Sequence, residues 1–141
     1  MKLTIPAETA RLPEVTAFVD DFLDTVDCPL RARMKFDLCV EEIFVNIASY
    51  AYPPGVKGLA QIEIGEQNGV VTVVFSDSGI YYDPLKKEDP DVTLPAAQRR
   101  IGGLGIFLVK KNMDSVEYVR DGDRNILTIR LDIGRRPAAE D

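Results

Sequence analysis

Two stretches in the first third of the chain carry apolar residues at every third or fourth position, which is the period of an amphipathic helix. The first covers residues 9–26, and its apolar positions are Leu12, Val15, Phe18, Val19, Phe22, Leu23 and Val26. Pro13 suits the first turn of a helix, where a missing N–H is tolerated, so we expect the helix to begin nearer Leu12 than Thr9. The second stretch follows the break Asp27-Cys28-Pro29 and predicts a helix that ends at about Ala51.

The second predicted helix has one core stripe and two polar flanks. The stripe consists of Phe36, Val40, Ile43, Ile47 and Ala51, with Cys39 and Phe44 at its edges. On a helical wheel Asp37 and Glu41 fall on one flank, and Glu42 and Asn46, four residues apart, fall on the other. We expect the first pair to be solvated and the second pair to border the core.

Alternating apolar and polar residues predict strands elsewhere in the chain. Residues 1–6 form a short first strand, and residues 60–64 and 71–75 form a hairpin around the turn pair Asn68-Gly69. A second hairpin joins residues 116–118 and 127–133 near Asp121-Gly122. A third helix is predicted over residues 103–113.

This order of elements predicts an α+β fold, in which a mostly antiparallel sheet is covered on one face by three helices as a two-layer sandwich. A doubly wound parallel sheet would need helices between successive strands. At 141 residues, 45% of them hydrophobic, the chain suits one domain with its own core, which we place at residues 1–134. Residues 135–141 are expected to be a frayed tail.

Charge and composition exclude several classes of function. A formal net charge of −6 without a basic stripe argues against a nucleic-acid partner. The sequence has no apolar run of the roughly 18 residues that span a bilayer and no signal-peptide pattern, so we expect a cytoplasmic protein without a membrane partner. The absence of histidine removes Ser/His/Asp and Cys/His catalysis, and the isolated Cys28 and Cys39 do not suggest a metal site.

Two glycine-containing segments, Asp77-Ser78-Gly79 and Gly102-Gly103-Leu104-Gly105, are candidates for a nucleotide-binding site. The residues between them, 80–101, lack periodicity and are long for a loop in a compact domain, which favours a lid over a ligand. Directly after them, Gly102, Gly103 and Gly105 open the third helix, where unpaired N–H groups and the helix dipole favour phosphate. These glycines could equally be an ordinary helix entry, since they match neither the dinucleotide nor the P-loop pattern. Asp77-Ser78-Gly79 alone would more often be a turn.

Taken together, three segments resemble the ATP-binding boxes of the GHKL superfamily. They are the segment from Glu42 to Asn46, the run Asp77-Ser78-Gly79-Ile80-Tyr81-Tyr82-Asp83-Pro84, and Gly102-Gly103-Leu104-Gly105-Ile106. This superfamily has the Bergerat fold and includes gyrase-type topoisomerases, histidine-kinase ATP domains and anti-sigma-factor serine kinases. The chain is most similar to the stand-alone anti-sigma serine kinase branch, and the resemblance covers nearly all of it.

The resemblance implies roles for individual residues. Asn46 would give an amide oxygen to Mg²⁺, and Asp77 would accept a hydrogen bond from the adenine amino group, with help from Thr128 through a water. Gly79 would let the backbone approach the purine. The N–H groups of the segment Gly102-Gly103-Leu104-Gly105 would bind the phosphates of ATP. Glu42 would orient or deprotonate the attacking hydroxyl.

The resemblance also implies a function and partners. The chain would be an ATP- and Mg²⁺-dependent serine/threonine kinase that phosphorylates a STAS-type anti-anti-sigma protein, could sequester a sigma factor, and forms a homodimer. An ATP-sensing binding module without turnover is a second possibility. The ATP domain of a histidine kinase fits less well, because the chain has no histidine.

Two positions depart from the pattern of this superfamily. Tyr50 stands where many relatives have histidine or lysine, and Asn125-Ile126 stands where a Gly-Thr pair is common. Arg99, Arg100 and Lys110 are candidates for the missing cation. Both departures weigh against catalysis more than against ATP binding.

Overall fold

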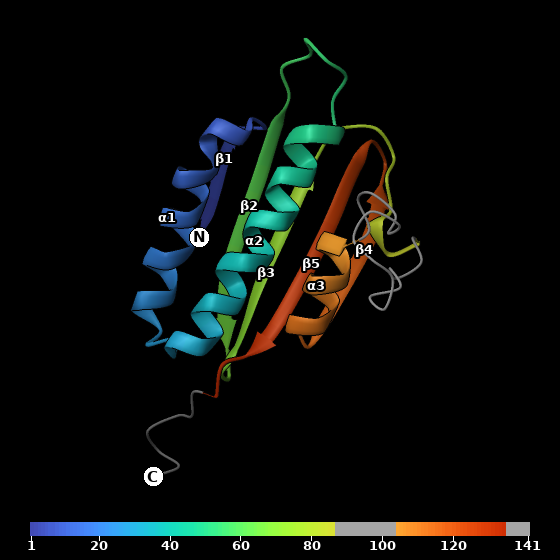
Figure 1. Cartoon of the computed structure of the whole chain (residues 1–141). Coiled ribbons are helices and arrows are strands. Elements are labelled where there is room, and N and C mark those ends of the chain that lie inside the picture. The colour runs from blue at the N-terminus through green and yellow to red at the C-terminus, as the bar shows by residue number, and fades with distance from the viewer. Residues whose placement is uncertain (87–103, 135–141) are drawn as a thin grey trace, which may run out of the picture.

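Five antiparallel strands and three helices make up the computed structural model, which describes residues 1–86 and 104–134 (Figure 1). The strands lie in the sheet order β1-β2-β3-β5-β4. Their bounds are β1 (Lys2–Pro6), β2 (Leu59–Gln67), β3 (Val70–Asp77), β4 (Ser115–Asp121) and β5 (Arg124–Asp132). Every neighbouring pair is antiparallel, which confirms the predicted α+β class.

The three helices cover one face of the sheet, as the sequence predicts (Figure 1). They are α1 (Leu12–Thr25), α2 (Leu30–Tyr50) and α3 (Leu104–Asn112), and α2 lies between the other two. Pro13 occupies the first turn of α1, and the residues before it form the 3₁₀ turn η1 (Thr9–Arg11). The helix therefore begins at Leu12, in agreement with the position expected for the proline.

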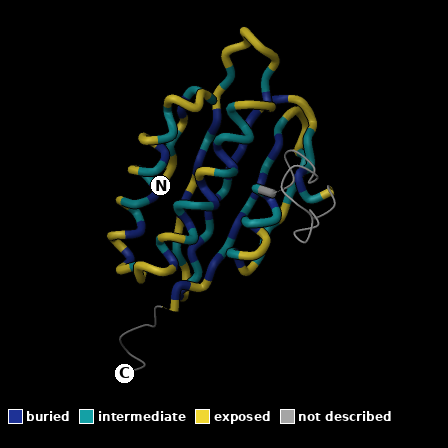
Figure 2. The backbone as a smooth tube through the Cα atoms, in the orientation of Figure 1, coloured by how far each residue is buried: buried dark blue, intermediate teal, exposed yellow. Residues whose placement is uncertain are grey.

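The core fills the space between the helices and the sheet. Figure 2 shows buried segments where helices face strands, and exposed segments on the loop 53–57. Apolar side chains of alternating sequence position, among them Val71, Val73 and Phe75 on β3, are almost completely excluded from solvent. This matches the two-residue period of a strand that is covered on one face.

The buried face of α2 is wider than the sequence predicts. Cys39 and Phe44, which we expected at the edges of the core stripe, are fully buried. Asp37, which we expected to be solvated beside Glu41, is half-buried and interacts with Asp20 of α1, whereas Glu41 is exposed. The reason is that α2 packs against α1, α3 and the sheet at once, so three sides of the helix lose contact with water.

Two hairpins confirm the predicted strand pairs. Asn68 and Gly69 join β2 to β3 with φ angles of 53° and 85°, the left-handed pair that a tight turn of this type requires. Gly122, with φ of 60°, lies between β4 and β5.

Parts of two predicted segments lie outside the described residues. The lid predicted over residues 80–101 is described only to Lys86, where the 3₁₀ turn η2 (Pro84–Lys86) ends, and the predicted tail at 135–141 is not described. Among the helices that the structure describes, none is long and apolar enough to cross a membrane.

Candidate functional site

A cavity of about 540 Å³, part of it open to solvent, lies between α2, the start of α3 and the ends of β3, β4 and β5. Apolar groups from α2 and the sheet, such as Ile47, Phe75 and Leu127, form much of its wall. The polar groups that line it are Asn46, Tyr50, Asp77, Tyr82, Tyr118 and Asn125. An apolar cavity with a few converging polar groups is typical of a binding site for an organic ligand.

Asp77 lies at the base of this cavity, at the end of β3. Its side chain is 6% exposed, and its Oδ1 atom accepts hydrogen bonds from the Gly79 backbone N–H (2.9 Å) and from Asn125 Nδ2 (3.0 Å). Within residues 1–86 and 104–134, no donor contacts the second oxygen, Oδ2. A carboxylate held in this way offers a ligand a single hydrogen-bond acceptor.

Gly79 lies against the end of α2. A Cβ atom at this position would be 2.2 Å from the Ala51 carbonyl oxygen, and the next residue, Ile80, donates its backbone N–H to that same oxygen (2.9 Å). The glycine is therefore required by the close approach of two backbone segments, in addition to any approach of a purine.

Tyr52 holds the loop after α2 against the end of β3, a role for which the sequence carries no signal. Its hydroxyl donates to the Leu59 carbonyl oxygen (2.6 Å) and accepts from the Ser78 backbone N–H (3.0 Å). The ring lies where a Cβ at Gly58 would be, 2.2 Å from the nearest ring atom. These contacts fix the backbone next to Asp77.

Asn46 and Glu42 lie one helical turn apart on α2 and are both half-buried. Asn46 lines the cavity, and the Glu42 carboxylate lies directly against α3, because a Cβ on Gly105 would be 2.5 Å from Glu42 Oε2. The predicted placement of this pair at the border of the core is therefore correct. Gly105 leaves room for a carboxylate at the first turn of α3, where the helix dipole favours negative charge.

The remaining predicted residues of the third box are only partly described. Leu104 begins α3, and Gly102 and Gly103 lie outside the described residues. Their expected contact with phosphate stays a prediction.

Thr128 does not reach the cavity. Along β5 the buried residues Asn125, Leu127, Ile129 and Leu131 alternate with residues of the opposite face, and Thr128 is one of the latter. The expectation that Thr128 helps Asp77 bind adenine through a water is therefore wrong. The two-residue period of the strand places Thr128 on the face away from the cavity. The apolar residues on either side of Thr128 already carry this signal in the sequence.

Asn125 takes the place expected for Thr128. It lies opposite Asp77 in the register of β3 and β5, is 7% exposed, and bonds directly to the Asp77 carboxylate. In the sequence, Asn125 stands out only as a departure from the superfamily pattern.

Residues of β4 support this corner of the cavity. The Tyr118 hydroxyl donates to Asn125 Oδ1, and Arg120 donates to Asn125 Oδ1 (3.1 Å) and to the Gly79 carbonyl oxygen (3.0 Å). The pKa of Tyr118 is raised, chiefly by burial, so its hydroxyl stays a neutral donor. The ring of Tyr118 also meets that of Tyr81 edge to face at 6.0 Å.

The oxygen atoms of the site suit an Mg²⁺ ion that binds together with the phosphates better than an Mg²⁺ ion held by protein side chains alone. Within the described part of the chain, no group of three or more His, Cys, Asp or Glu side chains could hold a metal. Asn46 and Glu42 supply hard oxygen atoms, and Mg²⁺ commonly takes one or two protein ligands together with phosphates and water. Cys39 is not a candidate ligand, because burial raises the pKa of its thiol to about 12.

Comparison with solved structures gives the same fold. The chain is similar to the blue-light activated histidine kinase EL346 of Erythrobacter litoralis, with 18% identity and a TM-score of 0.58 over 76% of this chain and 32% of that one. The histidine kinase domain of the same protein matches with a TM-score of 0.57 and 18% identity, over 92% of this chain and 62% of the other. Our chain thus spans about a third of the longer of these two structures.

Sequence comparisons identify the family. The serine/threonine-protein kinase BtrW of Bordetella bronchiseptica is 28% identical over 99 residues, which are 70% of this chain and 70% of that protein. A model of the histidine kinase-like ATPase domain matches residues 5–131. This match includes the cavity and every element around it, and it agrees with the three segments that resemble the GHKL boxes. The chain therefore belongs to the histidine kinase-like ATPase domain family, of the GHKL type.

Proposed function

We propose that this chain is an ATP- and Mg²⁺-dependent protein serine/threonine kinase that acts as an anti-sigma regulatory factor and phosphorylates a STAS-type anti-anti-sigma protein. The observation that carries the proposal is that one cavity joins Asp77 and Asn46, with the Glu42 carboxylate beside the start of α3. The name of the BtrW relative supports serine or threonine as the acceptor.

The residues of the cavity have separate tasks in this proposal. Asp77 Oδ2 accepts a hydrogen bond from the exocyclic amino group of adenine, and the Asn46 amide oxygen is a ligand for the metal ion. Bound Mg²⁺ would neutralise phosphate charge. Glu42 orients the acceptor hydroxyl and takes its proton, within a reaction that depends mainly on positioning and charge neutralisation.

Transfer of labelled phosphate tests the proposal. The protein is incubated with γ-labelled ATP, Mg²⁺ and candidate STAS proteins, and the labelled residue is identified by mass spectrometry. We expect Glu42→Gln to abolish transfer while ATP binding is retained, because the amide fills the same space without a basic oxygen. Glu41→Gln, on the exposed flank of α2, is the matched control and should transfer normally. Labelling of no serine or threonine in any STAS partner would contradict the kinase proposal.

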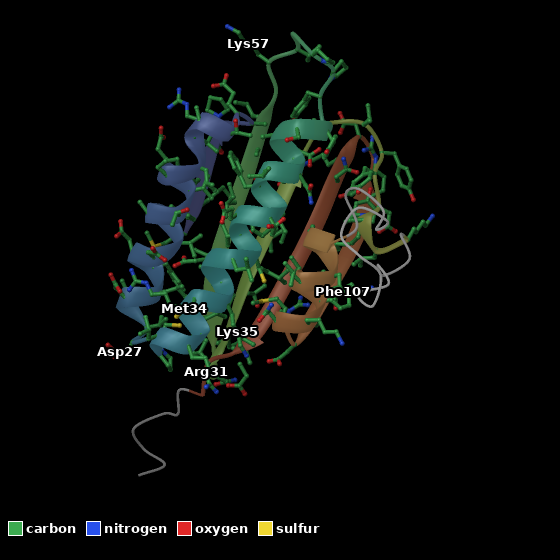
Figure 3. All side chains as sticks on the ribbon, viewed as in Figure 1. Asp27, Arg31, Met34, Lys35, Lys57 and Phe107 are labelled. Atoms are coloured by element: carbon green, nitrogen blue, oxygen red, sulfur yellow. The ribbon has the colours of Figure 1, made fainter. Side chains whose placement is uncertain are left out.

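An ATP-sensing module is the second candidate, and one observation favours it. Within the described part of the chain, no lysine or arginine lines the cavity, and Tyr50 lies at its edge with 55% of its surface exposed. Lys57 is at the tip of the loop between α2 and β2 and points away from the rest of the molecule (Figure 3). For a sensor, Glu42→Gln would leave ATP-dependent binding of the partner unchanged.

Homodimer formation and sequestration of a sigma factor belong to the same proposal. Both come from the resemblance to the anti-sigma kinase branch. Sedimentation equilibrium of the full chain, with and without ATP and Mg²⁺, measures the first. A single species of monomer mass at all concentrations would contradict it.

A further inference from the structure

Asn125 has every hydrogen-bonding group of its amide in use. Nδ2 donates to Asp77 Oδ1 (3.0 Å) and to the Ile80 carbonyl oxygen (2.8 Å). Oδ1 accepts from the Tyr118 hydroxyl, from Arg120 (3.1 Å) and from the Tyr82 backbone N–H (3.4 Å). Because both hydrogens of Nδ2 are engaged, the amide has no donor left for a ligand.

The chemistry of the neighbours fixes which way this amide points. A guanidinium and a backbone N–H can only donate, so the amide oxygen must face Arg120 and Tyr82. The Ile80 carbonyl can only accept, so the amide nitrogen must face the other side. A rotated amide would lose these bonds, and water could not replace them, because Asn125 is only 7% exposed.

Asn125 thereby determines how Asp77 faces the cavity. With Gly79 N–H and Asn125 Nδ2 both on Oδ1, rotation of the carboxylate is opposed by two bonds, and Oδ2 is the oxygen left for a ligand. The same amide joins the segment 80–82, which forms part of the cavity wall, to β4 and β5.

We propose that Asn125 is the positioning residue of the base-binding site and acts through Asp77, with Tyr118 and Arg120 holding its amide. This inference rests on the nucleotide site of the proposed function. Its specific consequence is that Asn125 strengthens the interaction with an exocyclic amino group of the base and leaves interactions with the rest of the nucleotide unchanged.

A pair of nucleotides that differ only in that amino group tests the inference. ATP and purine riboside 5′-triphosphate, which lacks the amino group, are titrated with Mg²⁺ into the wild-type chain and into Asn125→Ala. We expect the wild type to prefer ATP, and the variant to lose about tenfold of its ATP affinity, which is near the lower limit for a hydrogen bond to a charged group because Asp77 itself is still present. Affinity for purine riboside triphosphate should stay nearly the same, so that the preference collapses.

Asn112→Ala is the control for deletion of a side-chain amide away from the cavity. Among the described residues, Asn112 Nδ2 donates only within α3, to the Leu108 carbonyl oxygen (2.8 Å), and the variant should keep the wild-type preference. If Asn125→Ala weakens both nucleotides equally, Asn125 has a structural role only and the inference is wrong. If the wild type binds ATP and the variant keeps its preference, this inference fails while the proposed function stands. If the wild type binds no ATP, both fail.

Asn125→Asp gives an independent readout that also serves if the alanine variant does not fold. Two carboxylates at this distance must share a proton to keep the bond between them. ATP affinity of the variant should therefore approach the wild-type value at low pH and fall as the pH rises, relative to wild type and Asn112→Ala measured in parallel. A variant whose pH profile follows that of the wild type would overturn the inference.

Discussion

Gly79 and Gly105 each lie against a close neighbour, but the two neighbours differ in how far they can move. A Cβ at Gly79 would meet the backbone carbonyl of Ala51, whereas the atom closest to a Cβ at Gly105 would be Oε2 at the end of the Glu42 side chain. Backbone at the end of a packed helix cannot shift without breaking other contacts, and a carboxylate on a flexible side chain can. The same substitution should therefore have different effects at the two positions.

At Gly79 we expect substitution by alanine to destabilise the fold. The 2.2 Å approach to Ala51 forces the loop away from α2, and the hydrogen bond from Ile80 to Ala51 is lost with it. Overpacking of this kind lowers the free energy of unfolding by about 3 kcal/mol, measured by urea denaturation. Gly65→Ala is the control, because no atom of residues 1–86 and 104–134 lies within 4 Å of its Cβ position on β2. Equal stability of the two variants would contradict the observed contact.

At Gly105 we expect alanine to change activity and leave the fold intact. The new methyl group displaces the Glu42 carboxylate from the start of α3, and alanine has a higher helix propensity than glycine. The free energy of unfolding should stay the same or rise by up to about 1 kcal/mol, while phosphoryl transfer decreases. Parallel urea denaturation and label-transfer assays measure both quantities. Full transfer by Gly105→Ala would mean that the position of Glu42 is not important for the reaction.

Between α1 and α2, a polar cluster interrupts an otherwise apolar interface. Arg33 of α2 bonds to Asp24 (2.5 Å) and lies 3.5 Å from Asp20 of α1. Buried oxygens of Asp20 and Asp37, both named Oδ1, have no hydrogen-bond partner within the described residues. A proton shared by the two carboxyl groups would give both of these oxygens a partner, and burial, followed by the hydrogen bond to Asp20 and its charge, raises the pKa of Asp37 from 3.8 to about 7.

This pKa predicts that the contact between α1 and α2 weakens as the pH rises. The folded state holds a proton on Asp37 that the unfolded chain has already lost between about pH 4 and pH 7, so stability decreases with pH across that window. Because Asp37 is half-buried, solvent screening limits the effect, and we expect about 1 kcal/mol between pH 5 and pH 8.

Asp37→Asn tests this pH dependence, since the amide mimics the protonated carboxyl group. We expect the variant to be more stable than the wild type at pH 8 and to lose this part of the pH dependence, as measured by urea denaturation at several pH values. Glu41→Gln on the exposed flank should leave the profile as it is in the wild type. If the free energy of unfolding changes by the same amount between pH 5 and pH 8 in the wild type and in Asp37→Asn, the raised pKa of Asp37 is contradicted.

For the whole molecule, the position of the cavity links ligand binding to folding. The cavity is bounded by α2, by α3 and by strands from both hairpins, so a ligand contacts segments that are far apart in the sequence. Such a ligand binds the folded chain and not the unfolded one, and it stabilises the fold by mass action.

We therefore expect ATP with Mg²⁺ to raise the free energy of unfolding by about 2.7 kcal/mol at a concentration of 100 times the Kd. Urea denaturation with and without nucleotide measures this difference. Addition of EDTA should reduce the stabilisation, because the phosphates lose their counter-ion. Unchanged stability at millimolar ATP and Mg²⁺ would contradict nucleotide binding in this cavity.

Local patterns in the sequence determined the elements and the class of fold. Helical and two-residue periods place side chains relative to their own backbone, so α1, α2 and both hairpins appear within a few residues of their predicted bounds. The three segments that resemble the GHKL boxes likewise led to the family, which the match over residues 5–131 confirms.

Only the tertiary structure decided which residues meet at the base of the cavity and between the helices. That Asn125 bonds to Asp77 depends on the register of β3 and β5, and that Asp37 meets Asp20 depends on the packing of α1 on α2. Cys39 and Phe44 are buried because neighbours lie on three sides of α2. Periodicity in one segment gives the direction of a side chain, but the distance to a residue far along the chain is set by how separate segments pack together.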